Sequence, residues 1–201
     1  INSSMGLWDF FFGKKHSAKP KKSKYLPEIE DPIDIRFVKN FTSNGGYFLY
    51  NDSKELVFSN LDKICLENSW ALEEIVCFEK EISELFSVSY LDKTFAKLNK
   101  FKALLIKCEY LISNSGKILL SDQQIKHLKL IELPKTILIS AKISQFSKDV
   151  SEAMSNLKNK YKINFPTNIT TLKAISKNEK NEKITSQTTD SKNIYLLLED
   201  F

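Results

Sequence analysis

Apolar residues recur at helical spacing in several segments of this chain, and short apolar runs separate those segments. Asp31 and Pro32 form a helix start and Gly45 a helix stop, and the apolar face between them consists of Ile33, Phe37, Val38 and Phe41. A second helix is expected from a cap at residues 51–53 to about Asn68, a short one near residues 81–86, and a long one over residues 144–161. The apolar stripe of the long helix is typical of core packing, and it consists of Phe146, Val150, Met154 and Leu157.

Seven short apolar runs between and after these helices predict strands. They cover residues 47–50, 74–78, 103–106, 110–113, 117–120, 136–141 and 194–198. The fourth and fifth runs flank Asn114-Ser115-Gly116, a composition that favours a β-hairpin turn with positive φ. Because strands and helices alternate, the sequence predicts an α/β fold with three α/β/α layers around a mostly parallel sheet.

The length of 201 residues favours one domain, which we expect over residues 25–201. Residues 1–4, before Met5, are expected to be a cloning remnant, and residues 1–24 as a whole are expected to form a basic, aromatic and flexible tail. Residues 176–193 are polar and of low complexity, so we expect a solvated loop there.

The positive charge of the chain is concentrated in that tail. The formal net charge is +5, and residues 1–24 hold six lysines against one acidic residue, so the remaining part is balanced. Arg36 is the only arginine among 30 basic residues. Specific recognition of bases and phosphates favours the guanidinium group, so no specific nucleic-acid partner is expected. An AT-rich genome is the alternative explanation for the shortage of arginine.

The tail also contains Trp8 and Phe10–Phe12 next to its lysines. Aromatic side chains beside a basic cluster are one pattern of weak peripheral membrane contact. The alternative is a tail that is disordered, or that folds back and covers a groove of the domain with its aromatic side chains.

The cysteines and histidines indicate neither a metal centre nor a cofactor. Cys65, Cys77 and Cys108 are widely spaced in apolar sequence, and His127 is the only histidine outside the tail. Free buried thiols, together with the absence of a long apolar span or a secretory signal, predict a cytoplasmic protein. No nucleophile elbow, phosphate-binding loop or metalloprotease motif is present, so the sequence leaves catalytic activity undecided.

Two loops carry candidate ligand-binding residues. The first is the turn Asn114-Ser115-Gly116-Lys117, where backbone N–H groups and a lysine are suited to hold an anion; the alternative is a plain hairpin turn. The second follows the long helix and contains Thr167, Asn168, Thr170 and Thr171. Its hydroxyl and amide groups are suited to hold a phosphate or a carboxylate, and the alternative is the cap of a short helix that includes Leu172.

Four segments of this chain together form a recognisable pattern: ISNSGKILLS, LPKTILISAKISQFSKDVSEAM, PTNITTLK and YLLLED. They resemble the LUD domain, which defines the lactate utilisation protein C family and part of the iron–sulfur-containing lactate utilisation protein B. The resemblance covers about residues 32–201. It implies the fold shared by sugar-phosphate isomerases, CoA transferases and formyltetrahydrofolate cyclo-ligases.

The chain departs from the family pattern at its polar positions. The family's Ala-Glu-Thr-Gly-Thr-like turn has Asn114 at its acidic position and Lys117 at its second Thr, and Gly-Pro-Ser-Arg becomes Phe165-Pro166-Thr167-Asn168. These changes remove a carboxylate and an arginine suited to acid–base chemistry and anion clamping. The resemblance therefore implies an accessory partner of iron–sulfur lactate-utilisation proteins. The alternative is an enzyme or sensor that binds a small anionic metabolite, such as a sugar phosphate, a CoA ester or a folate-like acid.

Overall fold

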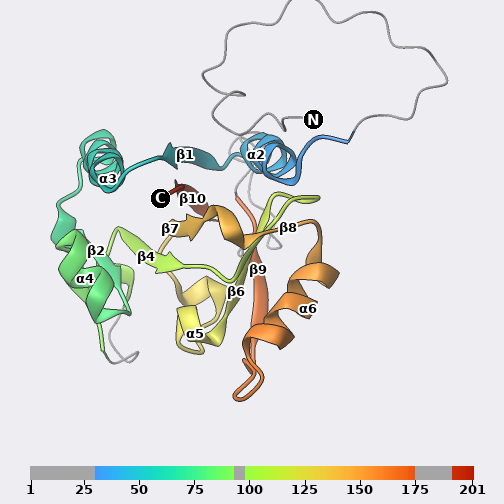
Figure 1. Cartoon of the computed structure of the whole chain (residues 1–201). Coiled ribbons are helices and arrows are strands. Elements are labelled where there is room, and N and C mark those ends of the chain that lie inside the picture. The colour runs from blue at the N-terminus through green and yellow to red at the C-terminus, as the bar shows by residue number, and fades with distance from the viewer. Residues whose placement is uncertain (1–29, 93–97, 175–191) are drawn as a thin grey trace, which may run out of the picture.

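A computed structural model of the chain describes residues 30–92, 98–174 and 192–201, and its centre is a six-stranded sheet (Figure 1). The strand order is β1-β10-β7-β4-β2-β3, and every neighbouring pair is parallel. The strands are β1 (Tyr47–Asn51), β2 (Ile75–Cys77), β3 (Ser89–Tyr90), β4 (Ala103–Lys107), β7 (Thr136–Lys142) and β10 (Asn193–Glu199). The predicted α/β fold with a mostly parallel sheet is confirmed.

A second sheet of four strands lies beside the first, in the order β8-β5-β6-β9. Its strands are β5 (Tyr110–Ile112), β6 (Lys117–Ser121), β8 (Phe146–Ser147) and β9 (Ile169–Leu172). β5 and β6 form the predicted antiparallel hairpin, and Gly116 has a positive φ of 63° in its turn. β9 occupies the place where a short helix containing Leu172 was one alternative, so that alternative is wrong.

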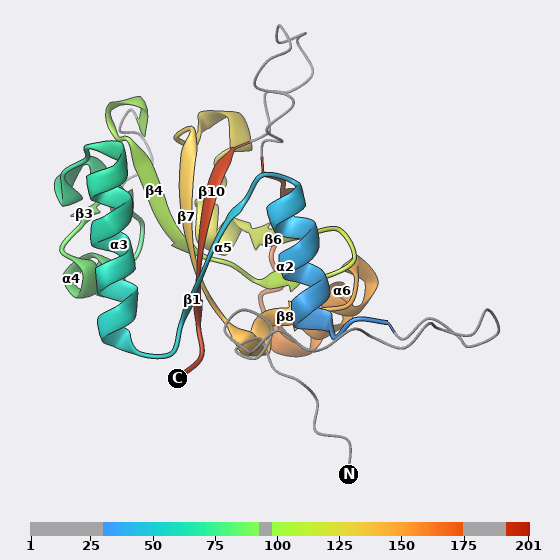
Figure 2. The ribbon, with the colours of Figure 1, turned by 90° about the horizontal axis from the view of Figure 1, so that it is seen from above.

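Helices cover both faces of the six-stranded sheet (Figure 2). On one face, α3 (Lys54–Asn68) and α4 (Lys80–Phe86) bury their apolar side chains against the strands. On the other face lie α2 (Ile33–Ser43), α5 (Asp122–Ile125) and the small sheet. α6 (Val150–Lys160) packs on the outer side of the small sheet through Ala153. Short 3-10 turns cover residues 72–74, 98–100, 130–132 and 143–145.

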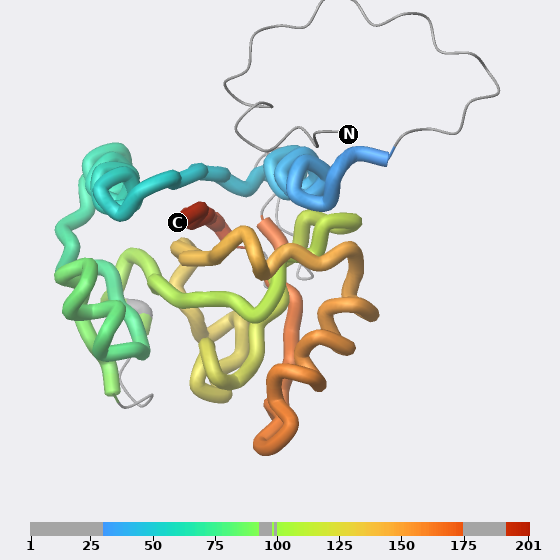
Figure 3. The backbone as a smooth tube through the Cα atoms, viewed as in Figure 1, coloured from blue at the N-terminus to red at the C-terminus, as the bar shows by residue number. Residues whose placement is uncertain are grey.

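The two ends of the domain meet in the large sheet. β10, from the end of the chain, lies between β1 and β7, which is visible in the tube view (Figure 3). Its residues Ile194, Leu196, Leu197 and Leu198 have no exposed surface, because helices or the small sheet cover both faces. A continuous apolar run of this kind is typical of a central parallel strand.

Two predicted helices begin elsewhere than the sequence indicated. The long helix starts at Val150 instead of Ser144, because the Asp149 side chain caps it by accepting a hydrogen bond from the Glu152 N–H. Phe146 lies in β8, and Val150 is 43% exposed, so neither belongs to a buried helical stripe. In α2 the cap is Pro32, and Ile33 is exposed while Ile35 is buried.

Residues 1–24 and residues 176–191 lie outside the described part of the chain, so the predictions for the tail, its membrane contact and most of the polar loop stay predictions. Asn193, the last residue of the expected loop, is the first residue of β10. None of the described helices combines the length and the hydrophobicity that a bilayer crossing requires.

We predict that Gly116→Ala is one of the most destabilising single changes in the domain. A Cβ atom at this residue would lie 2.4 Å from the Phe41 nitrogen, and the positive φ strains any other residue. Urea denaturation should show a loss of roughly 2–4 kcal/mol. Ser151→Ala, on the exposed side of α6, is the control and should stay within about 0.5 kcal/mol of wild type.

Candidate functional site

A cavity of about 320 Å³ opens at the edge of the large sheet where its parallel strands end. Its wall comes from the ends of β4, β7 and β10, from the turn after β7, and from α4. The lining residues are Glu81, Ile82, Leu85, Phe86, Lys107, Ser140, Ala141, Lys142, Gln145 and Glu199. Ligands of open α/β sheets bind outside the carboxyl ends of the strands, so this is the place where the fold favours a site.

The strand order explains why a cavity forms at this edge. The chain moves outward from β2 to β3, returns to β4 on the other side of β2, and then continues through β7 to β10. Connections leave the ends of β2 and β4 in opposite directions, which creates a crevice. Lys107 and Glu79 bridge it with an ion pair of 2.6 Å.

One side of the cavity is apolar and the other is polar. α4 contributes Ile82, Leu85 and Phe86. On the polar side, the Ser140 hydroxyl donates to Glu199 Oε1 at 2.6 Å. The ammonium group of Lys142 forms no ion pair with any described residue, so this charge is available to an anion.

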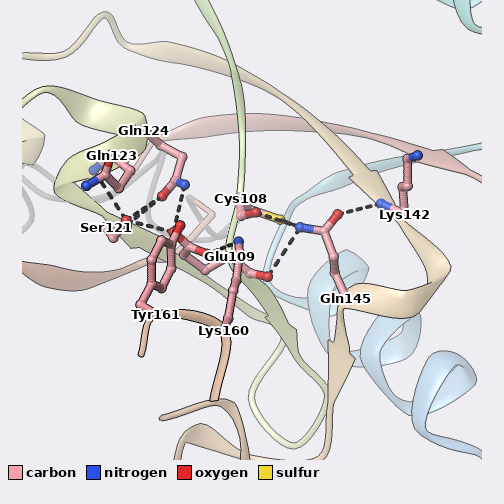
Figure 4. Close-up of polar contacts among 9 residues, drawn as sticks. All are labelled: Cys108, Glu109, Ser121, Gln123, Gln124, Lys142, Gln145, Lys160 and Tyr161. Carbon is pink, nitrogen blue, oxygen red and sulfur yellow. Dashed lines mark hydrogen bonds and ion pairs between the residues drawn. The ribbon is translucent and has the colours of Figure 1, made fainter. Parts of the chain in front are cut away.

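Gln145, in the cavity wall, is held by hydrogen bonds to the backbone. Its Nε2 donates to the carbonyl oxygens of Cys108 at 2.6 Å and Glu109 at 3.2 Å, and its Oε1 accepts from the Lys142 N–H at 2.7 Å (Figure 4). The side chain is therefore positioned before any ligand arrives.

Behind this wall lies a buried carboxylate, Glu109, which is 1% exposed. Four side chains donate hydrogen bonds to it (Figure 4): Ser121 at 2.7 Å, Gln124 at 2.8 Å, Lys160 at 2.7 Å and Tyr161 at 3.0 Å. A buried charge is tolerated only when it is paired and hydrogen-bonded, and Glu109 meets both conditions.

The charges of this cluster favour ionised Glu109 and Lys160 and a protonated Tyr161. Burial alone raises the pKa of Glu109, but the hydrogen bonds from Lys160, Gln124 and Ser121 outweigh it and lower that pKa. Burial alone would lower the pKa of Lys160, but the hydrogen bond to Glu109 outweighs burial and raises the pKa of Lys160 above its ordinary value. Burial and Glu109 together raise the pKa of Tyr161. None of these groups is poised to exchange a proton near neutral pH.

The predicted turn at Asn114–Lys117 packs against α2. The N–H groups of Ser113, Asn114, Ser115 and Gly116 are bonded to carbonyl oxygens of the protein, and Arg36 donates to Asn114 Oδ1 at 3.0 Å. The side chain of Asn44 donates to the Ser115 carbonyl. These contacts give the turn a structural role, and anion binding there stays a prediction.

The second predicted loop borders another cavity of about 320 Å³. Asn168 and Thr170 line it, opposite Ile125 at the end of α5 and Lys129 in the segment that joins α5 to β7. Thr167 instead donates its N–H and its hydroxyl to Asp122 Oδ2, at 3.1 and 2.5 Å. Thr170 and Thr171 pair with β6 as part of β9.

The structure places the two predicted loops at opposite ends of β6, although Thr171, which pairs with Leu119, lies nearer to Lys117. Lys117 begins β6, whereas Ile169 pairs with Ser121 at the other end of the same strand. Four residue steps of about 3.4 Å place these ends on the order of 14 Å apart. The two loops therefore cannot hold one small ligand between them.

The sequence interpretation missed both Glu109 and the cavity at the sheet edge. The signal for Glu109 was one acidic residue between two apolar strands, in LIKCEYLI. The signal for the cavity was polar residues at strand ends, namely Lys107, Ser140, Lys142 and Glu199. Among the described residues, no group of three or more His, Cys, Asp or Glu is arranged to hold a metal ion.

Comparisons with known proteins identify the family of this domain. The family model described as the LUD domain matches residues 36–198. A crystal structure of a DUF162 family protein from Deinococcus radiodurans is similar in fold, with a TM-score of 0.62 and 14% sequence identity. The match covers 84% of this chain and 96% of that one. No curated protein matches the chain.

We predict that the ionised Glu109 adds to stability at neutral pH. Because its pKa is lower in the folded than in the unfolded protein, this contribution is present above the unfolded value, about 4.3, and disappears as the pH falls through the folded pKa. Urea denaturation of wild type should show a steeper loss of stability below about pH 4 than that of Glu109→Gln. Equal pH dependence in the two proteins would contradict this assignment.

Proposed function

Since this chain belongs to the LUD domain family, we propose that it binds a small anionic metabolite in the cavity at the carboxyl ends of its parallel strands. The observation that carries the proposal is the combination of an ammonium group without an ion-pair partner among the described residues, an apolar wall and a fixed amide in one cavity. Lys142, Leu85 and Gln145 provide these three features.

The size and chemistry of the cavity support this class of ligand. Its volume is at the small end of the range for ligand pockets, so it encloses a small molecule or one end of a larger one. Lys142 supplies charge for an anionic group, and α4 supplies an apolar surface for a carbon skeleton. A CoA ester or a folate-like acid would place only one end in this cavity.

We propose further that the protein is an accessory component of lactate utilisation in the cytoplasm and a partner of iron–sulfur lactate-utilisation proteins. Family membership and the resemblance to lactate utilisation protein C support this role. The family's acidic turn position is Asn114, which accepts a hydrogen bond from Arg36. An amide at this position supplies no general acid or base, which supports an accessory role over acid–base catalysis.

A second candidate site is the cavity that Asn168 and Thr170 line. An amide, a hydroxyl and the nearby Lys129 supply the groups that hold a carboxylate or a phosphate. Thr167 and Thr171 are bonded within the domain and would support this site indirectly.

We expect a thermal-shift screen to identify ligands of the main cavity. The panel contains lactate, benzoate, sugar phosphates, CoA esters, folates and nucleotides. A ligand at 100 times its Kd adds about 2.7 kcal/mol, which shifts Tm by several degrees at about 2–4 °C per kcal/mol. Lys142→Met should abolish the shift, whereas Lys158→Met, an exposed lysine on α6, should preserve it. A shift that survives Lys142→Met but is lost in Asn168→Ala would move the site to the second cavity.

The lactate role predicts a growth phenotype. Deletion of the gene should slow growth of the source organism on lactate as sole carbon source and leave growth on glucose unchanged. Complementation by the wild-type gene should restore growth. Normal growth of the deletion strain on lactate would contradict the accessory role and leave the ligand proposal to be decided by the binding screen.

A further inference from the structure

The Glu109 carboxylate is 1% exposed, and an ionised group loses a large hydration energy on burial. Its four side-chain donors come from distant parts of the chain. Ser121 and Gln124 belong to the end of β6 and to α5, and Lys160 and Tyr161 to the end of α6. One carboxylate therefore ties three elements together.

Glu109 lies at a point where the chain passes from one sheet to the other. Cys108 and Glu109 form the first crossing between the sheets, because they join β4 of the large sheet to β5 of the small sheet. A second crossing between the sheets runs from β7 to β8 and contains Gln145. Gln145 Nε2 donates to both carbonyl oxygens of the first crossing, so the two crossings are hydrogen-bonded to each other.

We propose that Glu109 is a positioning residue for the ligand cavity. Its side chain holds the Cys108–Glu109 crossing in place, and the carbonyl groups of that crossing orient Gln145 in the cavity wall (Figure 4). Glu109 does not line the cavity itself. The effect on ligand binding rests on the function proposed above, whereas the effect on the crossing does not.

General energetics support a positioning role over a purely stabilising one. Buried ion pairs contribute little net stability compared with apolar residues of similar volume, because desolvation offsets the attraction. A charge with several donors does fix geometry, since each bond has a preferred direction and the group has few alternative partners. Lys160 remains about half exposed, so it is the member of the cluster that bulk water reaches.

The three cysteines provide a local measurement of this role. Cys108 is 3% exposed and lies in the crossing, while Cys65 in α3 and Cys77 in β2 are buried elsewhere. A thiol reagent modifies a buried cysteine only when its surroundings open. The alkylation rates of the three residues, read by mass spectrometry on the full chain, therefore distinguish local opening from general loosening.

We expect Glu109→Gln to raise the alkylation rate of Cys108 by about tenfold or more, because the charge-assisted bond to Lys160 is lost. Cys65 and Cys77 should accelerate by no more than the loss of global stability, measured by urea denaturation, accounts for. Lys160→Met should reproduce the effect, Lys160→Arg should restore protection, and Lys158→Met on the same helix should have none. Equal acceleration of all three cysteines, or an unchanged Cys108, would overturn the positioning role.

Calorimetric titration with benzoate separates this inference from the proposed function. If benzoate binds the wild type, Glu109→Gln should weaken that binding severalfold at a temperature where both proteins are fully folded. If benzoate binds both proteins equally while Cys108 becomes reactive, Glu109 holds the crossing in place but does not position the cavity. That result would overturn the proposal that Glu109 is a positioning residue for the cavity. If no anion of the screening panel binds the wild type, the proposed function fails, and the alkylation rates still decide whether Glu109 holds the crossing.

Discussion

The parallel pairing of β10 with both β1 and β7 holds the two ends of this domain in one sheet. The run of apolar residues in β10 is completely covered, so this strand contributes to the cores on both faces of the sheet. The same pairing aligns Glu199 at the end of β10 with Lys142 at the end of β7. The edge that carries the cavity is therefore a consequence of the strand order.

A second constraint acts between the two sheets. The two sheets share an apolar core, and the chain crosses between them at residues 108–109 and 143–145, which belong to neither sheet's strands. Polar side chains satisfy the backbone at these crossings, above all Gln145. Glu109 extends the bonding to α5 and α6. The cavity wall and the buried carboxylate thus form one continuous hydrogen-bonded unit.

Sequence patterns were sufficient for most of the fold, because strands such as β7 and β10 are long apolar runs and the turn at Gly116 has a composition that favours positive φ. The helix start at Asp149 was also readable from its capping residue, yet the apolar residue Phe146 extended the predicted helix too far. The candidate site could be predicted less well from the sequence. Strand order brings Lys142 and Glu199 to one edge, and single-sequence periodicity does not reveal strand order.

The central claim is that the cavity at the sheet edge holds the ligand of this protein. Chemical-shift mapping on ¹⁵N-labelled protein, titrated with the strongest anion from the screening panel, tests it most directly. The account predicts that the largest changes fall on the backbone amides of Lys107, Ser140, Lys142 and Gln145, while the turn at residues 114–117 stays unchanged. Changes concentrated at that turn or around Asn168, with none at the strand ends, would contradict it.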